Sequence, residues 1–163
     1  MKEYSIRMVE PNDLTACHTI EALCFPPGEA AWTTSLETRI QTYPEGFFVA
    51  ECDGKVVGQI NSGSTDKDDI SDEAFKQLIG HDPEGNNIVI FSLSVLPEYR
   101  KTGIGKELLT SFIKQAQELE KTRILLLCKE DLVNYYSRFG FKDSGISAST
   151  HGGAEWHEMA LSL

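Results

Sequence analysis

One stretch of the chain, residues 93–109, constrains the fold more than any other part of the sequence. An apolar segment ends at Pro97, a short basic loop follows with Gly103 and Gly105, and apolar residues then recur at helical spacing. A helix that begins after such glycines leaves its first backbone N–H groups unpaired, and the positive end of its dipole favours an anion. The stretch therefore predicts a strand–loop–helix unit whose loop binds a pyrophosphate.

The same loop carries three cationic side chains, Arg100, Lys101 and Lys106, in a chain whose net charge is −10. A negative charge of this size disfavours general nucleic-acid binding, because a polyanion would be repelled at long range. It is compatible with a cationic substrate. The basic loop is a local exception in an acidic protein, which supports its assignment to an anionic ligand.

Length and composition predict one domain, residues 1–163, with a single core. The first residues lack the apolar region of a signal peptide, and no apolar run approaches the roughly 20 residues that span a bilayer. The four cysteines form no C-x-x-C pair, which favours reduced thiols in the cytoplasm and argues against a zinc site. The acidic run at 66–73 lacks the glycine and the glutamate that an EF-hand requires, so no metal is expected.

Hydrophobic periodicity and turn residues predict the secondary structure. Strands are expected over residues 4–9, 47–51, 55–62, 88–96 and 123–128, from residue 141, and over 155–161. Helices are expected over 11–24, from a capping box at 34–37 to Tyr43, over 73–79, after Gly103, and over 132–139. On the first helix Leu14, Cys17, Glu21 and Cys24 fall on one side. The order of elements predicts an α/β protein with a mixed sheet of about seven strands, flanked by four or five helices.

Three nucleotide-binding motifs can be compared with the loop. A P-loop would need glycine at Arg100 and serine or threonine at Glu107, so that pattern fails. A Rossmann fingerprint would need glycine at Leu108, and in Rossmann folds it lies much nearer the start of the domain, so this pattern also fails. The pattern R-x-x-G-x-G, after an apolar strand that ends in V-x-P, matches residues 100–105 at every fixed position.

This third pattern resembles motif A of the GCN5-related N-acetyltransferases (GNAT), which bind acetyl-coenzyme A (acetyl-CoA). Residues 135–141, Tyr-Tyr-Ser-Arg-Phe-Gly-Phe, resemble a second signature of the same family, Y-x-[KR]-x-G-F. The segment 128–139, the Phe25-Pro26-Pro27 loop and Glu158-Met159 resemble the arylalkylamine (serotonin) N-acetyltransferase branch. The resemblance implies the GNAT fold, acetyl-CoA as co-substrate, and direct attack of an amine on the thioester in a ternary complex.

The resemblance also implies roles for individual residues. The cofactor would be bound by Leu93, Ser94, Val95, Arg100, Lys101, Thr102, Gly103, Ile104, Gly105, Lys106, Asn134 and Tyr136. The backbone of Leu93 and Val95 would pair with the pantetheine arm like an added strand. A backbone N–H of Val95 or its neighbour, exposed by a bulge, would bind the oxyanion. Tyr136 matches the tyrosine that protonates the departing thiolate, although a core aromatic would also suit this position.

The base that deprotonates the amine is left open by the sequence. The serotonin branch uses two histidines on the central strand, and the matching positions here are Val89 and Phe91, which accept no proton. His81 lies near a histidine of that branch and is the first candidate. Further candidates are Glu51, His151 and His157, or a water chain anchored on the hydroxyls of Ser92 and Ser94.

The acceptor pocket is expected at the loop after the first helix. Phe25, Pro26, Pro27 and Trp32 offer apolar and aromatic surface for an arylalkyl group or an ammonium ion, although ordinary packing under a proline-rich loop is an equal explanation. The predicted function is acetyl transfer to a small primary amine by a monomer or weak homodimer. Two alternatives stay open: acetylation of a protein amino terminus or lysine, and a CoA-binding domain without catalysis.

Overall fold

The computed structural model describes residues 3–163 and confirms the predicted mixed α/β fold. Seven strands form one sheet in the order β1-β2-β3-β4-β5-β7-β6. They are β1 (Tyr4–Met8), β2 (Phe48–Cys52), β3 (Lys55–Thr65), β4 (Asn87–Val95), β5 (Arg123–Cys128), β6 (Lys142–Ile146) and β7 (His157–Ser162). Neighbouring strands are antiparallel except for β4 and β5, which are parallel.

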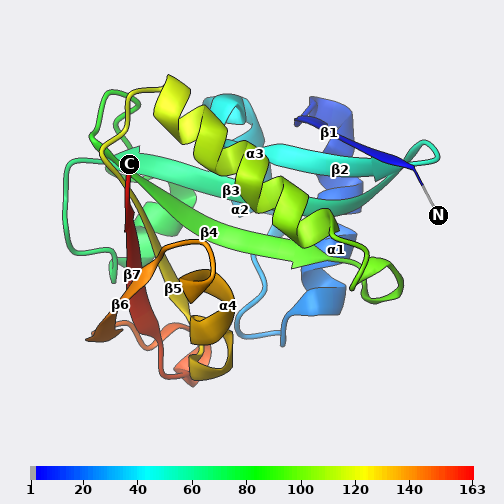
Figure 1. Cartoon of the computed structure of the whole chain (residues 1–163). Coiled ribbons are helices and arrows are strands. Elements are labelled where there is room, and N and C mark those ends of the chain that lie inside the picture. The colour runs from blue at the N-terminus through cyan, green and yellow to red at the C-terminus, as the bar shows by residue number, and fades with distance from the viewer. Residues whose placement is uncertain (1–2) are drawn as a thin grey trace.

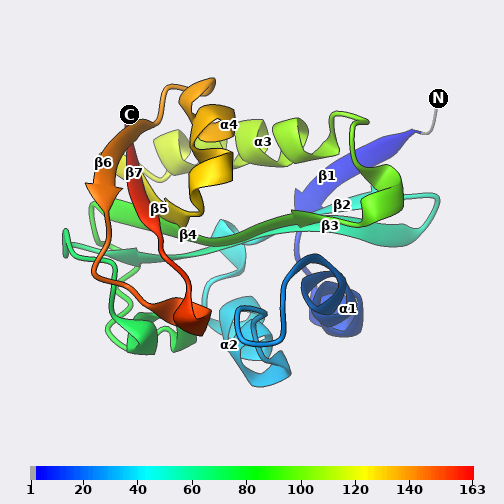
Figure 2. The same ribbon diagram turned by 90° about the horizontal axis from the view of Figure 1, so that it is seen from below.

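Helices cover both faces of the sheet. They are α1 (Leu14–Cys24), α2 (Thr33–Thr42), α3 (Ile104–Glu118) and α4 (Val133–Ser137). Figure 2 shows α3 and α4 on one face and α1 and α2 on the other. The two faces of β4, in the middle of the sheet, are therefore covered by different helices. Those on one face precede β4 in the chain, and those on the other face follow it.

The helix α3 packs along the sheet through one apolar face. Its buried side chains are Ile104, Leu108, Leu109, Phe112 and Ala116, each at most 2% exposed. Gly58 on β3 allows this close approach, because a Cβ there would lie 3.1 Å from the Leu108 side chain and 3.3 Å from that of Ile104. The packing of α3 fixes the position of its N-terminus, which follows the basic loop.

The strands β4 and β5 separate after a short parallel ladder. Their paired residues run only from Asn87 opposite Arg123 to Ile90 opposite Leu126. Beyond this point β4 continues to Val95 alongside β3 alone, and Figure 1 shows the two strands diverging. The second half of β4 consequently presents one backbone edge that no neighbouring strand of the sheet covers.

A bulge lies on β4 where the separation begins. Asn61 of β3 is opposite Ser92 and Ser62 is opposite Ile90, so Phe91 is the extra residue. A bulge interrupts the alternation of side chains along a strand. Here Phe91 and Ser92 both contact the α1–α2 face, Phe91 through Phe75 and Ser92 through Glu21.

Several predicted boundaries need correction. The capping box at residues 34–37 is wrong, because α2 begins at Thr33 and the Trp32 carbonyl accepts the first helical hydrogen bond, from the N–H of Leu36. The helix predicted over 73–79 is a 3-10 turn, η3 (Glu73–Gln77), which ends at Leu78 in the left-handed conformation. The first helix starts with a 3-10 turn, and β3 extends to Thr65 because it pairs there with Asn87.

Other expectations concern membranes, metals and cysteines. Within residues 3–163, no helix has the length and apolar character to cross a bilayer, and no group of three or more histidine, cysteine, aspartate or glutamate side chains is placed to hold a metal ion. All four cysteines are free thiols, of which Cys24 is half-buried and the other three are buried.

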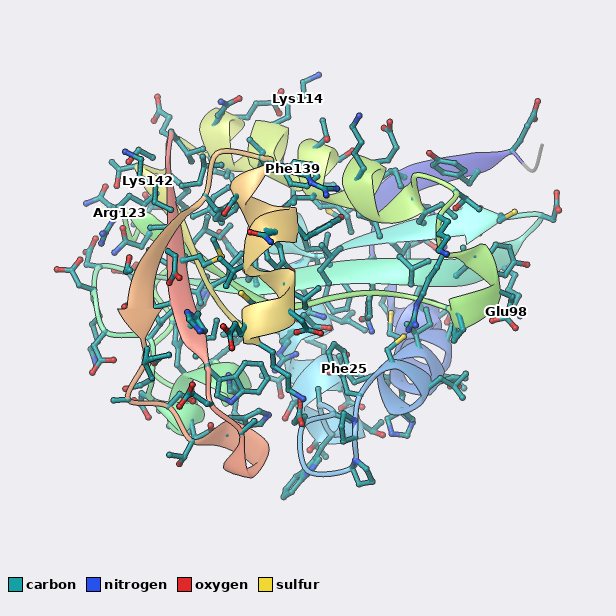
Figure 3. The ribbon with its side chains drawn as sticks, turned by 60° about the horizontal axis from the view of Figure 1, so that its bottom comes forward. Phe25, Glu98, Lys114, Arg123, Phe139 and Lys142 are labelled. Carbon is teal, nitrogen blue, oxygen red and sulfur yellow. The ribbon has the colours of Figure 1, made fainter. Side chains whose placement is uncertain are left out.

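The core under α3 gives a prediction for stability. Phe112→Ala should lower the free energy of unfolding by about 3–5 kcal/mol, because the substitution leaves a cavity at a fully buried position. Urea denaturation followed by circular dichroism measures the change. Lys114 lies on the exposed side of the same helix (Figure 3), so the free energy of unfolding of Lys114→Ala should stay within about 0.5 kcal/mol of the wild-type value. A loss below 1 kcal/mol for Phe112→Ala would contradict this packing.

Candidate active site

The basic loop between β4 and α3 has the geometry of an anion site. A 3-10 turn, η4 (Pro97–Tyr99), leads to Lys101 and Gly103, which have positive φ values of 64° and 89°. Gly103 is the N-cap of α3. The first N–H groups of this 15-residue helix have no partner within it, so they can bind an anion together with the helix dipole.

The cations around this loop are exposed. Lys101 and Lys106 form no ion pair within residues 3–163. Arg100 donates from Nε to the carbonyl oxygen of Val95 at 3.1 Å, and its Nη2 lies 3.4 Å from the Cys24 sulfur. A pyrophosphate would therefore find two free ammonium groups, while Arg100 ties the loop to the end of β4.

The backbone of β4 can bind an extended arm next to this loop. The Val95 carbonyl accepts hydrogen bonds from Arg100 and from the Cys24 thiol, whereas the N–H of Leu96 donates to Val57 on β3. Since both polar groups of one residue point to the same side of an antiparallel strand, the N–H groups of Val95 and Leu93 face the open edge. This edge and the α3 loop suit the pantetheine and pyrophosphate of CoA.

A cavity of about 390 Å³ lies on the other side of the β4–β5 separation. It lies between the α1–α2 loop, α2, η3, β4, β5 and the segment before β7. Among the residues predicted for the site, its lining includes Phe25, Trp32, Leu93 and Tyr136. Phe25, labelled in Figure 3, begins the loop after α1, and Trp32 at the other end of that loop is 71% exposed. The lining does not include Pro26, Pro27 or Asn134.

A buried carboxylate, Glu21, lies in the lining and is 3% exposed. Its Oε1 accepts from the backbone N–H of Ala31 at 2.9 Å. Its Oε2 accepts from Ser92 Oγ at 3.0 Å and from Gln59 Nε2 at 3.3 Å. The carboxylate thus connects α1, the loop after α1, β3 and β4.

Arg39 lies at the other end of this polar network. Its Nη1 donates to Asn61 Oδ1 at 3.0 Å, and Asn61 Nδ2 donates to Gln59 Oε1 at 3.3 Å. The guanidinium also stacks over the Phe91 ring, 4.5 Å from its centroid. Burial lowers the pKa of Arg39 to about 10, and the charge of Glu21 acts in the opposite direction. Arg39 remains charged at neutral pH.

Four distant segments of the chain meet at the cavity. His151 Nδ1 lies 2.9 Å from the Glu73 carboxylate on η3, and its Nε2 lies 3.0 Å from the carbonyl oxygen of Glu29. The Glu29 carboxylate forms an ion pair with Lys129 Nζ at 2.8 Å, and Trp156 Nε1 donates to the His151 carbonyl. We refer to the contacts among Glu29, Glu73, Lys129, His151 and Trp156 as the roof.

Tyr136 lies in α4, on the β5 side of the cavity, and is 7% exposed. Its ring meets those of Tyr135 and Phe141 edge to face. Burial, with smaller contributions from Cys128 and Tyr135, raises the pKa of Tyr136. The phenol is consequently protonated at neutral pH and can donate a proton.

The structure does not bring the first base candidate to the cavity. His81 packs on Tyr43, and its Nδ1 accepts from the N–H of Ser64 at 2.9 Å, away from the cavity lining. Glu51 pairs with Arg7, and His157 with Asp143, outside the lining. His151 does line the cavity, but both of its ring nitrogens are engaged in the roof.

Sequence reasoning missed the main polar residues of the cavity, Glu21 and Arg39. A signal existed for Glu21, since it falls on the same side of α1 as Cys17, which is completely buried. A carboxylate on the buried side of a helix requires hydrogen-bond donors, and those come here from β3 and β4. Val89 and Phe91, at the positions of the branch's histidines, do line the cavity.

The sequence matches the Acetyltransferase (GNAT) family over residues 14–141, and the chain therefore belongs to this family. An N-alpha-acetyltransferase of Sulfurisphaera tokodaii is 30% identical over 146 residues, which cover 87% of this chain and 82% of that protein. An uncharacterised N-acetyltransferase of Bacillus subtilis is 29% identical over 132 residues, 74% of this chain and 58% of that protein.

A serotonin N-acetyltransferase, that of Mesocricetus auratus, is 30% identical over 112 residues, 68% of this chain and 53% of that protein. The chain thus spans little more than half the length of two of these relatives. Because the identities are nearly equal, they support the GNAT superfamily and do not single out the serotonin branch.

Solved structures share the fold. The loading GNATL domain of CurA from Lyngbya majuscula has a TM-score of 0.86 at 18% identity, covering 98% of both chains. The GphF GNAT-like decarboxylase in complex with isobutyryl-CoA has a TM-score of 0.85 at 20% identity, covering 97% of this chain and 98% of that one.

The basic loop between β4 and α3 gives a prediction for acetyl-CoA binding. Gly103→Val should weaken acetyl-CoA binding about tenfold or more, because a β-branched residue is strained at φ 89° and would displace the N–H groups at the start of α3. Isothermal titration calorimetry measures the affinity. Gly80→Val, at φ 86° in another turn, should lower stability and leave the affinity unchanged. Equal affinities for the wild type and Gly103→Val would contradict the assignment of this loop.

Proposed function

We propose that the protein is an acetyl-CoA-dependent N-acetyltransferase whose acceptor is a small primary amine with an aromatic or apolar group. The observation that carries this proposal is the 390 Å³ cavity, which combines aromatic walls with the buried carboxylate of Glu21 at the end of the open β4 edge. Family membership and the N-acetyltransferase relatives support the reaction type.

The cofactor side follows from the β4 edge and the α3 loop. The backbone groups of Leu93 and Val95 would hold the pantetheine arm, and the loop from Lys101 to Lys106 would hold the pyrophosphate. When bound, acetyl-CoA supplies an activated acetyl thioester. An N–H group on the open edge of β4, beside the bulge at Phe91, would stabilise the oxyanion.

Tyr136 would supply the proton that the departing thiolate needs. It lines the cavity from the β5 side, opposite the open edge of β4, and its raised pKa keeps it protonated. Tyr136 shares the cavity lining with Leu93 of β4 and Leu126 of β5, which suits a group that acts on the sulfur.

The roof supports a small acceptor over a peptide. It joins the α1–α2 loop, η3, the segment after β5 and the segment before β7 at the cavity. An extended peptide would require these contacts to open, whereas an arylalkylamine fits beneath them. Phe25, Phe75, Phe91 and Trp156 supply aromatic surface for the acceptor and for cation–π contact with its ammonium group.

A panel of acceptors tests the proposal. Thiol release from acetyl-CoA should be at least about tenfold faster, in kcat/KM, with arylalkylamines than with basic peptides, because the roof contacts leave room for the former. Faster acetylation of a peptide amino terminus would contradict the small-amine proposal and indicate that the acceptor is a protein. Tight acetyl-CoA binding without turnover of any amine or peptide would instead identify a CoA-binding domain.

Removal of the phenol tests the role of Tyr136. Tyr136→Phe should lower kcat about 100-fold, because the thiolate loses its proton donor, while acetyl-CoA affinity changes less than about twofold. Since the pKa of Tyr136 is raised, the phenol should stay protonated below about pH 10, and its deprotonation should not lower the wild-type kcat in that range. Tyr43→Phe, a buried tyrosine outside the cavity, should retain the wild-type kcat. An unchanged kcat for Tyr136→Phe would remove this residue from the mechanism.

A further inference from the structure

We propose that Glu21 is the amine-side catalytic residue: its carboxylate binds the ammonium group of the acceptor and takes its proton. This inference rests on the proposed function, because it assigns a role in that reaction. It provides the base that Val89 and Phe91 cannot supply and that His81 is not placed to supply.

The position of Glu21 is the first argument. It lies in the last turns of α1, lines the cavity, and is bonded to Ser92, the residue after the β4 bulge. The open edge of β4, where the thioester is expected, starts at this bulge. An amine nitrogen in contact with Glu21 would therefore lie beside the part of the strand that holds the reacting carbonyl.

The geometry of the carboxylate is the second argument. Three donors hold it: the Ala31 N–H on Oε1, and Ser92 Oγ and Gln59 Nε2 on Oε2. A carboxylate has about four acceptor positions, so Oε1 retains one for a ligand. The three bonds fix the side chain in one orientation before the substrate arrives.

The charge balance is the third argument. No ion pair involves Glu21 within residues 3–163, and the nearest cation of its network, Arg39, is separated from it by the amides of Gln59 and Asn61. A buried carboxylate without a directly bound cation is costly, and an ammonium ion would compensate it.

The other carboxylates around the cavity are already engaged or exposed. The Glu29 carboxylate forms an ion pair with Lys129, and the Glu73 carboxylate lies within hydrogen-bond distance of the His151 ring. Asp72 is exposed and accepts from the N–H of Ala74 at the start of η3. Within residues 3–163, Glu21 is thus the buried carboxylate of the lining that has no directly bound cation or histidine.

The proton transfer is balanced within the overall reaction. An N–H bond of the ammonium breaks, an O–H bond forms on Glu21, and the nitrogen keeps the electron pair with which it attacks the thioester. Glu21 later returns this proton to water, which accounts for the proton released when a charged amine becomes a neutral amide. Attack forms the C–N bond, and the C–S bond breaks as Tyr136 gives its proton to the departing thiolate. The nitrogen then loses a second proton, which restores the Tyr136 phenol through solvent.

Glu21→Gln tests the role, provided that the readout distinguishes catalysis from structure. The bond to Ala31 also holds the loop after α1, so a loss of activity alone would be ambiguous. At neutral pH the variant should lower kcat/KM about 100-fold for an arylalkylamine, whose ammonium has a pKa near that of lysine, about 10. As the pH approaches 10, the amine loses its proton unaided and the deficit should shrink to less than about threefold.

A second substrate sharpens the test. An aromatic amine that is uncharged at neutral pH needs no deprotonation before attack, so Glu21→Gln should lower its rate far less than that of the arylalkylamine at the same pH. Glu29→Gln is the matched control, because it alters another carboxylate of the same cavity. Any loss of kcat/KM that Glu29→Gln causes should be the same at every pH.

Thermal unfolding and acetyl-CoA titration establish that the variants are folded. If Glu21→Gln does not fold, Glu21→Asp, which withdraws the carboxylate by one methylene, should show the same relief of its deficit at high pH. An equal deficit at all pH values and for both amines, or no deficit, would overturn the role of Glu21. Absence of turnover by the wild type with any amine would instead reject the proposed function.

Discussion

The separation of β4 from β5 is the constraint on which the rest of the structure depends. Parallel strands are normally buried among neighbours that satisfy their backbone groups. Here the ladder stops after Ile90, and in the described part of the chain the remaining half of β4 pairs with β3 alone. The backbone groups that are left over can be satisfied by a ligand that runs along the strand. The α3 loop and α4 then lie at the two sides of that ligand's path.

The bulge at Phe91 gives this strand two functions. Beyond it, Leu93 and Val95 present their backbone to the open edge, while Ser92 contacts the polar network of Glu21. The bulge also turns Phe91 toward Arg39 and Phe75. A regular strand would direct Phe91 and Ser92 to opposite faces, and the cavity would lose one of its walls.

The strand–loop–helix unit proposed to bind the cofactor could be predicted from the sequence because its determinants are local. Gly103, the cations and the apolar periodicity of α3 lie within one short segment, so the pattern alone indicated the anion site. The acceptor side is assembled from segments far apart in the chain. Glu21 could be placed on the buried side of its helix, but nothing local showed that Gln59 and Ser92 would be its donors. The family resemblance implied a bulge near Val95, but no local pattern placed it at Phe91. Nor did any local pattern show that His81 would accept a hydrogen bond from Ser64, away from the cavity.

The roof has a consequence for how such a protein can change. The residues proposed to bind the cofactor lie almost entirely in one continuous stretch, whereas the roof is contributed by four separate segments. Loops tolerate substitution and insertion better than the strands and helices they connect. Exchange of residues such as Glu73 or Trp156 can therefore reshape the acceptor cavity during evolution while the machinery for the acyl donor stays intact. The same separation would allow new acceptor preferences to be selected in the laboratory from libraries confined to these loops.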